Sequence, residues 1–272
     1  MDILDAIKAY IYKKRVKEAL IGTSTLEFKQ LLNFTPIGCY HANDLEWLFD
    51  VRNYSNDDSC KILAEELGRL IIEHTDKVQQ FDYRDLSALE NSRTSTYYPD
   101  VYTFGAMCYS IHQSNWTLAS CSQSITNRFK NIPYFIVDYF EWNKKYIWYN
   151  DDQSHHMATG IFLATRDNLP ICFNTQITRY SLDKTLLRKI LNNHYGFLMS
   201  RDTYFRLYDL FEKSKLNFDE FCTPILASGG VNMLIFLGKN KPNKFSDLLA
   251  KILSNRDKRY ILDFNEYMEQ YL

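Results

Sequence analysis

Residues 145–180 constrain the fold more than any other stretch, because they combine strand, turn and helix signals in a fixed order. Tyr146–Tyr149 is a run of aromatic and β-branched residues, which favour a pleated, half-buried strand. Ile171–Ile177 is a second strand candidate, and Pro170 before it cannot continue a helix. The stretch therefore predicts two strands joined by a polar turn and a helix.

The turn and the helix start hold the residues that are best suited to chemistry. Asp152 and Ser154 are of the types that accept hydrogen bonds from the N–H groups that open a helix. His155 and His156 follow at once. Apolar residues then recur at helical spacing, at Met157, Ile161, Phe162 and Ala164. Two histidines behind an acidic turn at a helix N-terminus make this segment the main candidate for a functional site.

The net charge of the chain does not indicate a large basic surface for nucleic acid. Lys and Arg total 32 against 33 for Asp and Glu, and the net charge is -1, although a local basic patch is compatible with this balance. Neither a GxGxxG nor a GxxxxGK[ST] loop occurs, so Rossmann and Walker-type phosphate binding are not supported. A phosphate group would therefore be held by a helix end rather than by a glycine loop.

Cysteine spacing and hydropathy indicate the compartment. The 6 cysteines are scattered and form no CxxC pair, which argues against zinc-ribbon and thioredoxin-type motifs. The N-terminus has no apolar signal core, and the longest apolar run, Val231–Leu237, is far too short to span a bilayer. We expect a cytoplasmic protein with reduced thiols and no membrane partner.

The order of elements predicts an α+β protein. Residues 1–95 are expected to be mainly helical, and residues 96–272 to mix strands with helices. Helices are expected over residues 2–20 and Cys60–His74, and strands over Tyr102–Ser110, Trp116–Ser120 and Tyr134–Phe140. The unpatterned stretch between the two parts suggests a boundary near residue 95.

The segment Asp152–Ala158 resembles the D-G-x-H-R-x-x-A turn of the ParB/sulfiredoxin-like family. Gln153 stands where that pattern has Gly, and His156 stands where it has Arg. The segment before the turn, Ile132–Val137, and the Leu169–Phe173 segment after the helix are similar to the family's flanking strands. The resemblance covers about residues 120–180.

The pattern of the whole chain predicts a helical N-terminal part followed by a mixed α/β part, and the resemblance implies that this second part has a ParB/sulfiredoxin-like strand–turn–helix–strand core. It implies that the phosphates of a nucleotide, ATP or CTP with Mg²⁺, lie against the turn. Members of the family carry out phosphotransfer, act as nucleotide switches on DNA, or are described as nucleases. Phosphate binding at this turn should weaken as pH rises and the histidines lose their protons.

The candidate site residues fall into two groups. The candidates for catalysis are Asp152, His155, His156 and Glu141, the last as a general base at the end of the strand before the turn. The candidates for binding the phosphate are Ser154, His155, His156, Arg128 and Asn127.

Two other chemistries fit the residues less well. Adjacent histidines on a helix point about 100° apart, so one metal ion would need Asp152, one of the two, and a distant His112 or His194. No spacing supports such a set, and we predict no metal site. A nucleophilic Cys108 or Cys121 with a histidine is allowed by chain order, but a buried structural cysteine is the commoner outcome.

Two hypotheses from different classes follow. The first is a protein that binds a nucleotide or a phosphorylated ligand at Asp152–His156, with phosphotransfer or phosphate-ester hydrolysis as its activity. The second is a non-catalytic nucleic-acid- or protein-interaction module in which the turn only caps a helix. Nothing in the sequence indicates an oligomeric state.

Overall fold

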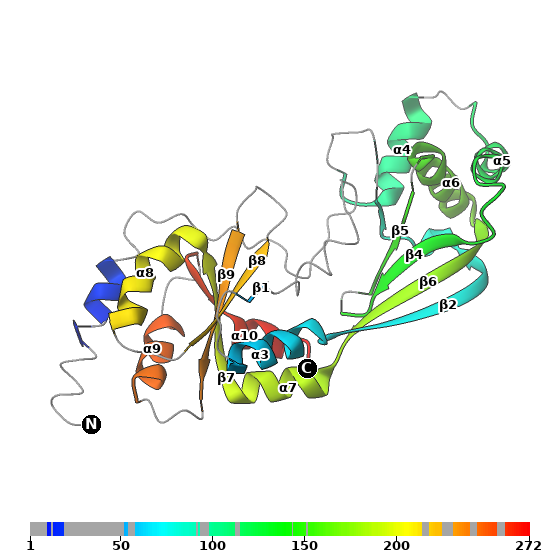
Figure 1. Cartoon of the computed structure of the whole chain (residues 1–272). Helices are drawn as coiled ribbons and strands as arrows, with labels where there is room; N and C mark the ends of the chain where they lie inside the picture. Colours follow the sequence, from blue (N-terminus) through cyan, green and yellow to red (C-terminus); the bar gives the residue numbers. More distant parts are fainter. Residues whose placement is uncertain are drawn as a thin grey trace. The chain divides into compact units, whose positions relative to one another are not determined.

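A computed structural model describes residues 10–11, 13–18, 52–53, 58–90, 92, 98–111, 115–142, 144–150, 152–213, 218–224, 231–239, 244–254 and 259–272. These residues fall into two compact units (Figure 1). Residues 71–182 form the inserted unit, and the described residues of 10–70 and 183–272 form the flanking unit. The chain passes between the units at Leu70–Ile71 and at Leu182–Asp183, where the Asp183 N–H donates to the Leu70 carbonyl at 2.8 Å.

The inserted unit is a mixed sheet with three helices. In chain order its elements are β2 (Ile71–Asp82), the 3-10 turn η1 (Tyr83–Asp85), β3 (Ala88–Leu89), α4 (Val101–Ile111), α5 (Leu118–Arg128), β4 (Phe135–Phe140), β5 (Lys145–Trp148), α6 (Ser154–Asp167) and β6 (Cys172–Leu182). The strand order is β2-β6-β4-β5-β3. β2 pairs antiparallel with β6, β6 parallel with β4, β4 antiparallel with β5, and β5 parallel with β3.

The core of the inserted unit lies between one face of the sheet and the helices, which Figure 1 shows grouped beside the strands. Phe135 and Val137 of β4 and Trp148 of β5 enter it from the sheet. The helices contribute apolar side chains, among them Phe104, Cys108, Ile125, Met157 and Ile161. Tyr83 is fully buried in this cluster, and its hydroxyl is 3.1 Å from Thr175 Oγ1, which satisfies both polar groups.

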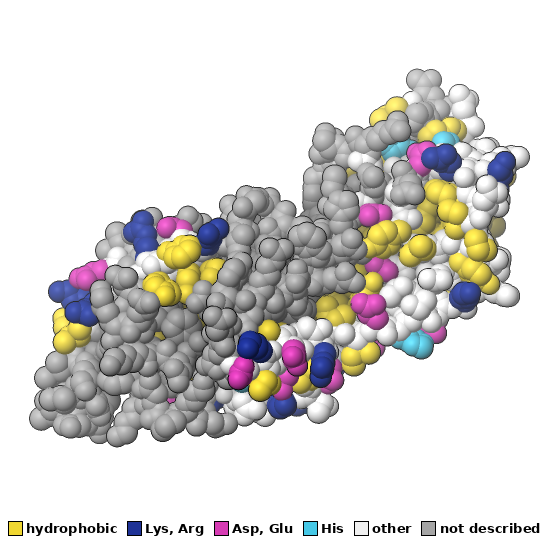
Figure 2. Space-filling view, viewed as in Figure 1, with side chains coloured by type: hydrophobic (Ala, Val, Ile, Leu, Met, Phe, Trp, Pro, Cys, Tyr) yellow, Lys and Arg dark blue, Asp and Glu magenta, His cyan; other side chains and the backbone are white. Residues whose placement is uncertain are grey.

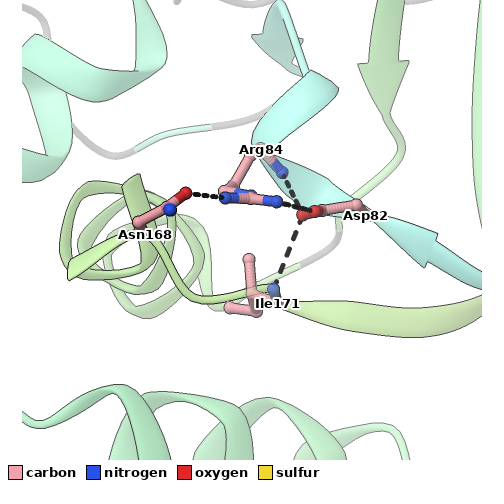
Figure 3. Close-up of polar contacts among 4 residues, drawn as sticks. All are labelled: Asp82, Arg84, Asn168 and Ile171. Carbon is pink, nitrogen blue, oxygen red and sulfur yellow. Dashed lines mark hydrogen bonds and ion pairs between the residues drawn. The ribbon is translucent and has the colours of Figure 1, made fainter. Parts of the chain in front are cut away.

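A carboxylate fixes the loop between α6 and β6 to the end of β2 (Figure 3). Asp82 Oδ2 accepts from Arg84 Nε at 2.8 Å and from Nη2 at 2.6 Å, and Oδ1 accepts from the Arg84 N–H at 3.1 Å. The Ile171 N–H reaches the same Oδ1 at 3.5 Å, and Arg84 Nη1 donates to Asn168 Oδ1 at 3.5 Å. Asn168 ends α6 with φ 53°, a left-handed conformation that asparagine tolerates well.

The flanking unit packs helices around an antiparallel sheet. Its elements are β1 (Arg52–Asn53), α3 (Asp58–Gly68), α7 (Lys184–Asn193), β7 (His194–Ser200), α8 (Arg201–Lys213), β8 (Phe218–Pro224), β9 (Val231–Gly238), α9 (Lys244–Ser254), β10 (Ile261–Asp263) and α10 (Phe264–Glu269). The strand order is β1-β8-β9-β7-β10. Its core joins the buried faces of β7, β9, α8 and α9.

The structure confirms the α+β class and several of the predicted elements. β4, β5, α6 and β6 form the predicted strand, strand, helix and strand. Residues 10–11 and 13–18 are helical, and the rest of the predicted helix over residues 2–20 lies outside the described residues. No helix in the described part of the chain is long and apolar enough to cross a membrane. The cytoplasmic location stays a prediction.

Two predicted strands are wrong, and one predicted helix is too long at its C-terminal end. Tyr102–Ser110 lies in the helix α4, and Trp116–Ser120 is the capped start of α5, in which Thr117 and Ser120 form a capping box. The predicted helix Cys60–His74 ends at Gly68, and β2 begins at Ile71. In the first two segments, helix packing outweighs the strand preference of the aromatic residues.

The two units divide the chain differently from the boundary expected near residue 95. Residues 71–95 belong to the inserted unit, because β2 pairs with β6 along most of its length. Residues 183–272 belong with the earlier part of the chain. Both features depend on pairing between distant segments, which a local pattern does not reveal.

Candidate functional site

The turn before α6 has a left-handed residue at its end. Gln153 is the residue that precedes α6, with φ 68° and ψ 15°, and its side chain makes no capping bond to the helix. Its N–H donates to Asp152 Oδ1 at 2.8 Å, and its carbonyl accepts from the Met157 N–H at 2.9 Å. Asn150, which is 1% exposed, donates from Nδ2 to the Asp152 carbonyl at 3.5 Å. The Asp152 contacts thus hold the turn itself, and the bond from Met157 to the Gln153 carbonyl ties the turn to the helix.

Helix α5 holds this turn from the side. Ser124 Oγ donates to Gln153 Oε1 at 3.0 Å, and Arg128 Nε lies 3.4 Å from Asp152 Oδ2. Ser124 and Arg128 are four residues apart, so they lie on one face of the helix. The Arg128–Asp152 pair is half exposed to solvent. Helix α5 therefore places beside the turn a guanidinium that a ligand can reach.

The two histidines point to different neighbours, as adjacent residues on a helix must. His155 meets Phe104 edge to face, with ring centroids 5.4 Å apart. His156 stacks on Trp116, with centroids 4.2 Å apart and ring planes 21° from parallel. Both are half-buried, and the adjacent Ser154 is 9% exposed. Each imidazole therefore has an aromatic neighbour.

The structure brings only part of the predicted set together. Asp152, Ser154, His155, His156 and Arg128 gather at the start of α6. Ser124, Trp116 and Phe104 also contact this site and were not predicted. The four-residue spacing of Ser124 and Arg128 is the sequence signal that could have found the serine.

Glu141 and Asn127 lie away from the turn. Glu141 follows β4 in the hairpin to β5, where its N–H donates to the Tyr180 carbonyl at 2.9 Å. The turn before α6 lies at the other end of β4, which is six residues long, or about 20 Å. Asn127 is exposed on α5, about 100° around the helix from Arg128. The structure therefore does not support Glu141 as a general base at this turn.

The other candidate chemistries gain no support from the geometry. Among the described residues, no group of three or more His, Cys, Asp or Glu side chains is placed to hold a metal ion. His112 lies outside the described residues, and His194 belongs to β7 of the flanking unit. Burial raises the pKa of Cys108 to about 12 and that of Cys121 to about 11, which disfavours the thiolate that a nucleophilic cysteine needs.

The fold and the site define an α+β protein of two units whose inserted unit presents an arginine at a helix N-terminus. The chain belongs to a family of unknown function (DUF6685), whose model matches residues 114–271. The match runs through α5, the turn and α6 and on into the flanking unit. No curated protein and no solved structure matches the chain.

The family match corrects the resemblance to the ParB/sulfiredoxin-like family, which is wrong. The matching family covers all of residues 120–180 and is a different family. The order strand, polar turn, helix and strand is shared by many α+β proteins. The Gly and Arg that would have been distinctive are replaced here by Gln153 and His156.

Proposed function

We propose that the turn before α6 binds the phosphate group of a small ligand, a nucleotide being the main candidate. Arg128 carries the proposal, because it places a permanent positive charge beside the start of a 14-residue helix. A helix N-terminus offers N–H donors and about half a positive charge to an anion. An arginine adds charge-assisted bonds in a fixed fork.

Asp152 occupies the position that a phosphate would compete for. Its pair with Arg128 has a 3.4 Å separation and is half exposed, so it contributes little to stability. An incoming phosphate can therefore replace Asp152 as the partner of Arg128 at small cost. The adjacent His155 and His156 add further donors when they are protonated.

Binding is the better supported part of this proposal, and catalysis is its extension. Phosphotransfer or phosphate-ester hydrolysis would rely on Asp152 and the two histidines for proton transfer, since Glu141 lies at the far end of β4. Mg²⁺ would enter with the nucleotide, because the described residues hold no ready metal group.

A non-catalytic interaction module is the alternative, and one observation favours it. His155 and His156 pack against Phe104 and Trp116, which gives both imidazoles a structural role without a ligand. In this version the turn only starts α6, and the partner is a nucleic acid or a protein.

Thermal unfolding with a ligand panel distinguishes the two. The panel is ATP, CTP, GTP, ADP and inorganic phosphate, each with and without Mg²⁺, at pH 6 and pH 8. A ligand at about 100 times its Kd stabilises the folded state by roughly 2.7 kcal/mol, which raises the unfolding temperature by several degrees. We expect a selective rise for the wild type that is lost in Arg128→Gln and weaker at pH 8.

The matched control is Arg166→Gln, in the last turn of α6, at the end of that helix away from the candidate site. Arg166 is also an exposed arginine paired with a carboxylate, since its Nε lies 2.6 Å from Asp167 Oδ1. This variant should keep the full ligand response. His155→Ala should lower both the stability and the ligand response. The phosphate site is refuted if no ligand raises the unfolding temperature of the wild type. It is also refuted if the ligands raise the unfolding temperature of Arg128→Gln as much as that of the wild type.

A further inference from the structure

Among the described residues, β2 is an edge strand of the sheet in the inserted unit. It has 12 residues, and of the strands that the structure describes it neighbours β6 alone. Ile72, Glu73, His74, Thr75 and Lys77 are exposed along it, and Figure 2 shows histidine and acidic side chains in the open where Figure 1 draws this strand. An edge strand presents a row of backbone N–H and C=O groups that another strand can pair with.

The sequence around Thr75 is complementary to itself when read backwards. It reads Ile72-Glu73-His74-Thr75-Asp76-Lys77-Val78. In an antiparallel pair centred on Thr75, glutamate faces lysine, histidine faces aspartate, and isoleucine faces valine. Opposite charges and apolar residues that face each other across a strand pair stabilise it. We propose that the β2 edge binds the same edge of a second copy of this chain, in this register.

The alternative registers lack this complementarity. Residues that face each other across a strand pair point to the same side of the sheet. For two copies related by a twofold axis normal to the sheet, the partner of any given residue can therefore change only by two positions at a time. One step places Asp76 opposite Asp76 of the second copy, and Glu73 opposite Gln79. The step the other way places His74 opposite His74. The Thr75-centred register therefore has the only full set of opposite charges among these three.

On the helix-covered face of β2, His74 and Asp76 already lie close to each other, beside the proposed contact. Val78 packs against the core there, so Ile72, His74 and Asp76 share that face by alternation. His74 Nε2 is 3.0 Å from Asp76 Oδ1, and Arg179 Nε is 3.1 Å from Asp76 Oδ2. The histidine of the second copy would add a donor to this aspartate.

The shape of β2 limits the contact to one segment. The pairing of β2 with β6 is interrupted between Val78 and Phe81, where Gln80 has φ 56°. Such a bulge bends the strand and ends a flat edge. Charges and bulges on an edge strand usually discourage pairing with another strand. Here the charges disfavour the other registers, but in the Thr75-centred register each charge faces an opposite charge. The proposed pair therefore spans Ile72–Val78.

Charge reversal tests the proposal, with sedimentation equilibrium over a wide concentration series as the measurement. Glu73→Lys and Lys77→Glu each place like charges opposite one another twice, because the axis repeats every contact. Each should weaken self-association by about tenfold or more. In an equimolar mixture of the two variants, every reversed charge faces an opposite charge again, and a mixed dimer should form with near wild-type affinity.

Glu65→Lys is the matched control, because it reverses an exposed glutamate on α3 of the flanking unit. It should leave self-association unchanged, and circular dichroism should show all variants to be folded. A wild type that stays monomeric throughout the series overturns the proposal. So does an unchanged dimer in both single variants, or a mixture that associates no better than its components.

Discussion

Asp82 joins three segments of the inserted unit through one carboxylate, which accepts bonds from Arg84 and from the Ile171 N–H. Partial burial opposes the charged form, but the Arg84 bonds outweigh it and lower the pKa of Asp82. The stability that Asp82 adds is therefore present above the carboxyl pKa of the unfolded chain, and is lost as pH falls through the folded pKa. Asp82→Asn should cost about 1 to 2 kcal/mol at pH 7.

Urea unfolding at pH 7 and at about pH 3 measures this effect, since model aspartates titrate near pH 3.9. The difference between Asp82→Asn and the wild type should shrink at the lower pH. Asp85→Asn is the control, because Asp85 is exposed three residues along the chain. It should change the stability by less than about 0.5 kcal/mol. An equal loss for both variants would contradict a specific role for Asp82.

The buried cysteines should be unreactive in the folded protein. Burial raises the pKa of Cys108 to about 12 and that of Cys121 to about 11, and both are inaccessible. Cys172 is half-buried, so it should be alkylated first of these three. Iodoacetamide labelling at pH 7.5 with peptide mapping measures the order. Labelling of Cys108 or Cys121 before the protein unfolds would contradict it.

The candidate site shows what a sequence reveals at the scale of single residues. Arg128 was predicted to lie near the turn, and it pairs with Asp152. Glu141 was placed there because it follows a strand, but β5 runs antiparallel to β4 and carries the chain back along it. The turn therefore forms at the other end of the hairpin. Strand direction depends on the pairing partner, which the residues beside Glu141 do not specify.

At the scale of elements, α4 was the least predictable part of the inserted unit. Its aromatic residues favour a strand by intrinsic preference, yet Phe104 and Cys108 face the core at helical spacing. Gly105 explains why the helix packs so closely. A Cβ built there would lie 2.0 Å from the Ala158 carbonyl oxygen of α6 and 2.9 Å from Phe162 Cβ. The contact that decides the element thus lies over 50 residues away in the sequence.

Gly105→Ala should accordingly destabilise the protein by about 3 kcal/mol or more, since α4 must move away from the α6 backbone. Gly68→Ala is the matched substitution at the end of α3, where no described atom beyond the helix's own backbone and the adjoining residues lies within 4 Å of the new Cβ. It should be neutral or stabilising by up to about 1 kcal/mol, because alanine restricts the unfolded chain. Urea unfolding of both variants provides the measurement. Equal stabilities would show that α4 and α6 tolerate greater separation.

At the scale of the whole molecule, the α+β class could be predicted and the division of the chain could not. The class follows from local patterns such as those of β4 and α6, which the sequence places within a few residues. The division depends on the pairing of β2 with β6, in which Ile71 faces Leu182. Long-range pairing of this kind is decided by the packing of both strands, so no window of sequence contains it.

The two units each have their own core, so they should unfold in separate steps. In scanning calorimetry, Asp82→Asn should lower the temperature of one transition only. Gly196→Ala should lower the other, because a Cβ on Gly196 of β7 would lie 2.9 Å from Phe236 and 3.0 Å from Phe264 in the flanking unit. Two mutations far apart in one cooperative unit would instead move a single transition together. That outcome would mean that the double connection at Leu70–Ile71 and Leu182–Asp183 couples the cores into one folding unit.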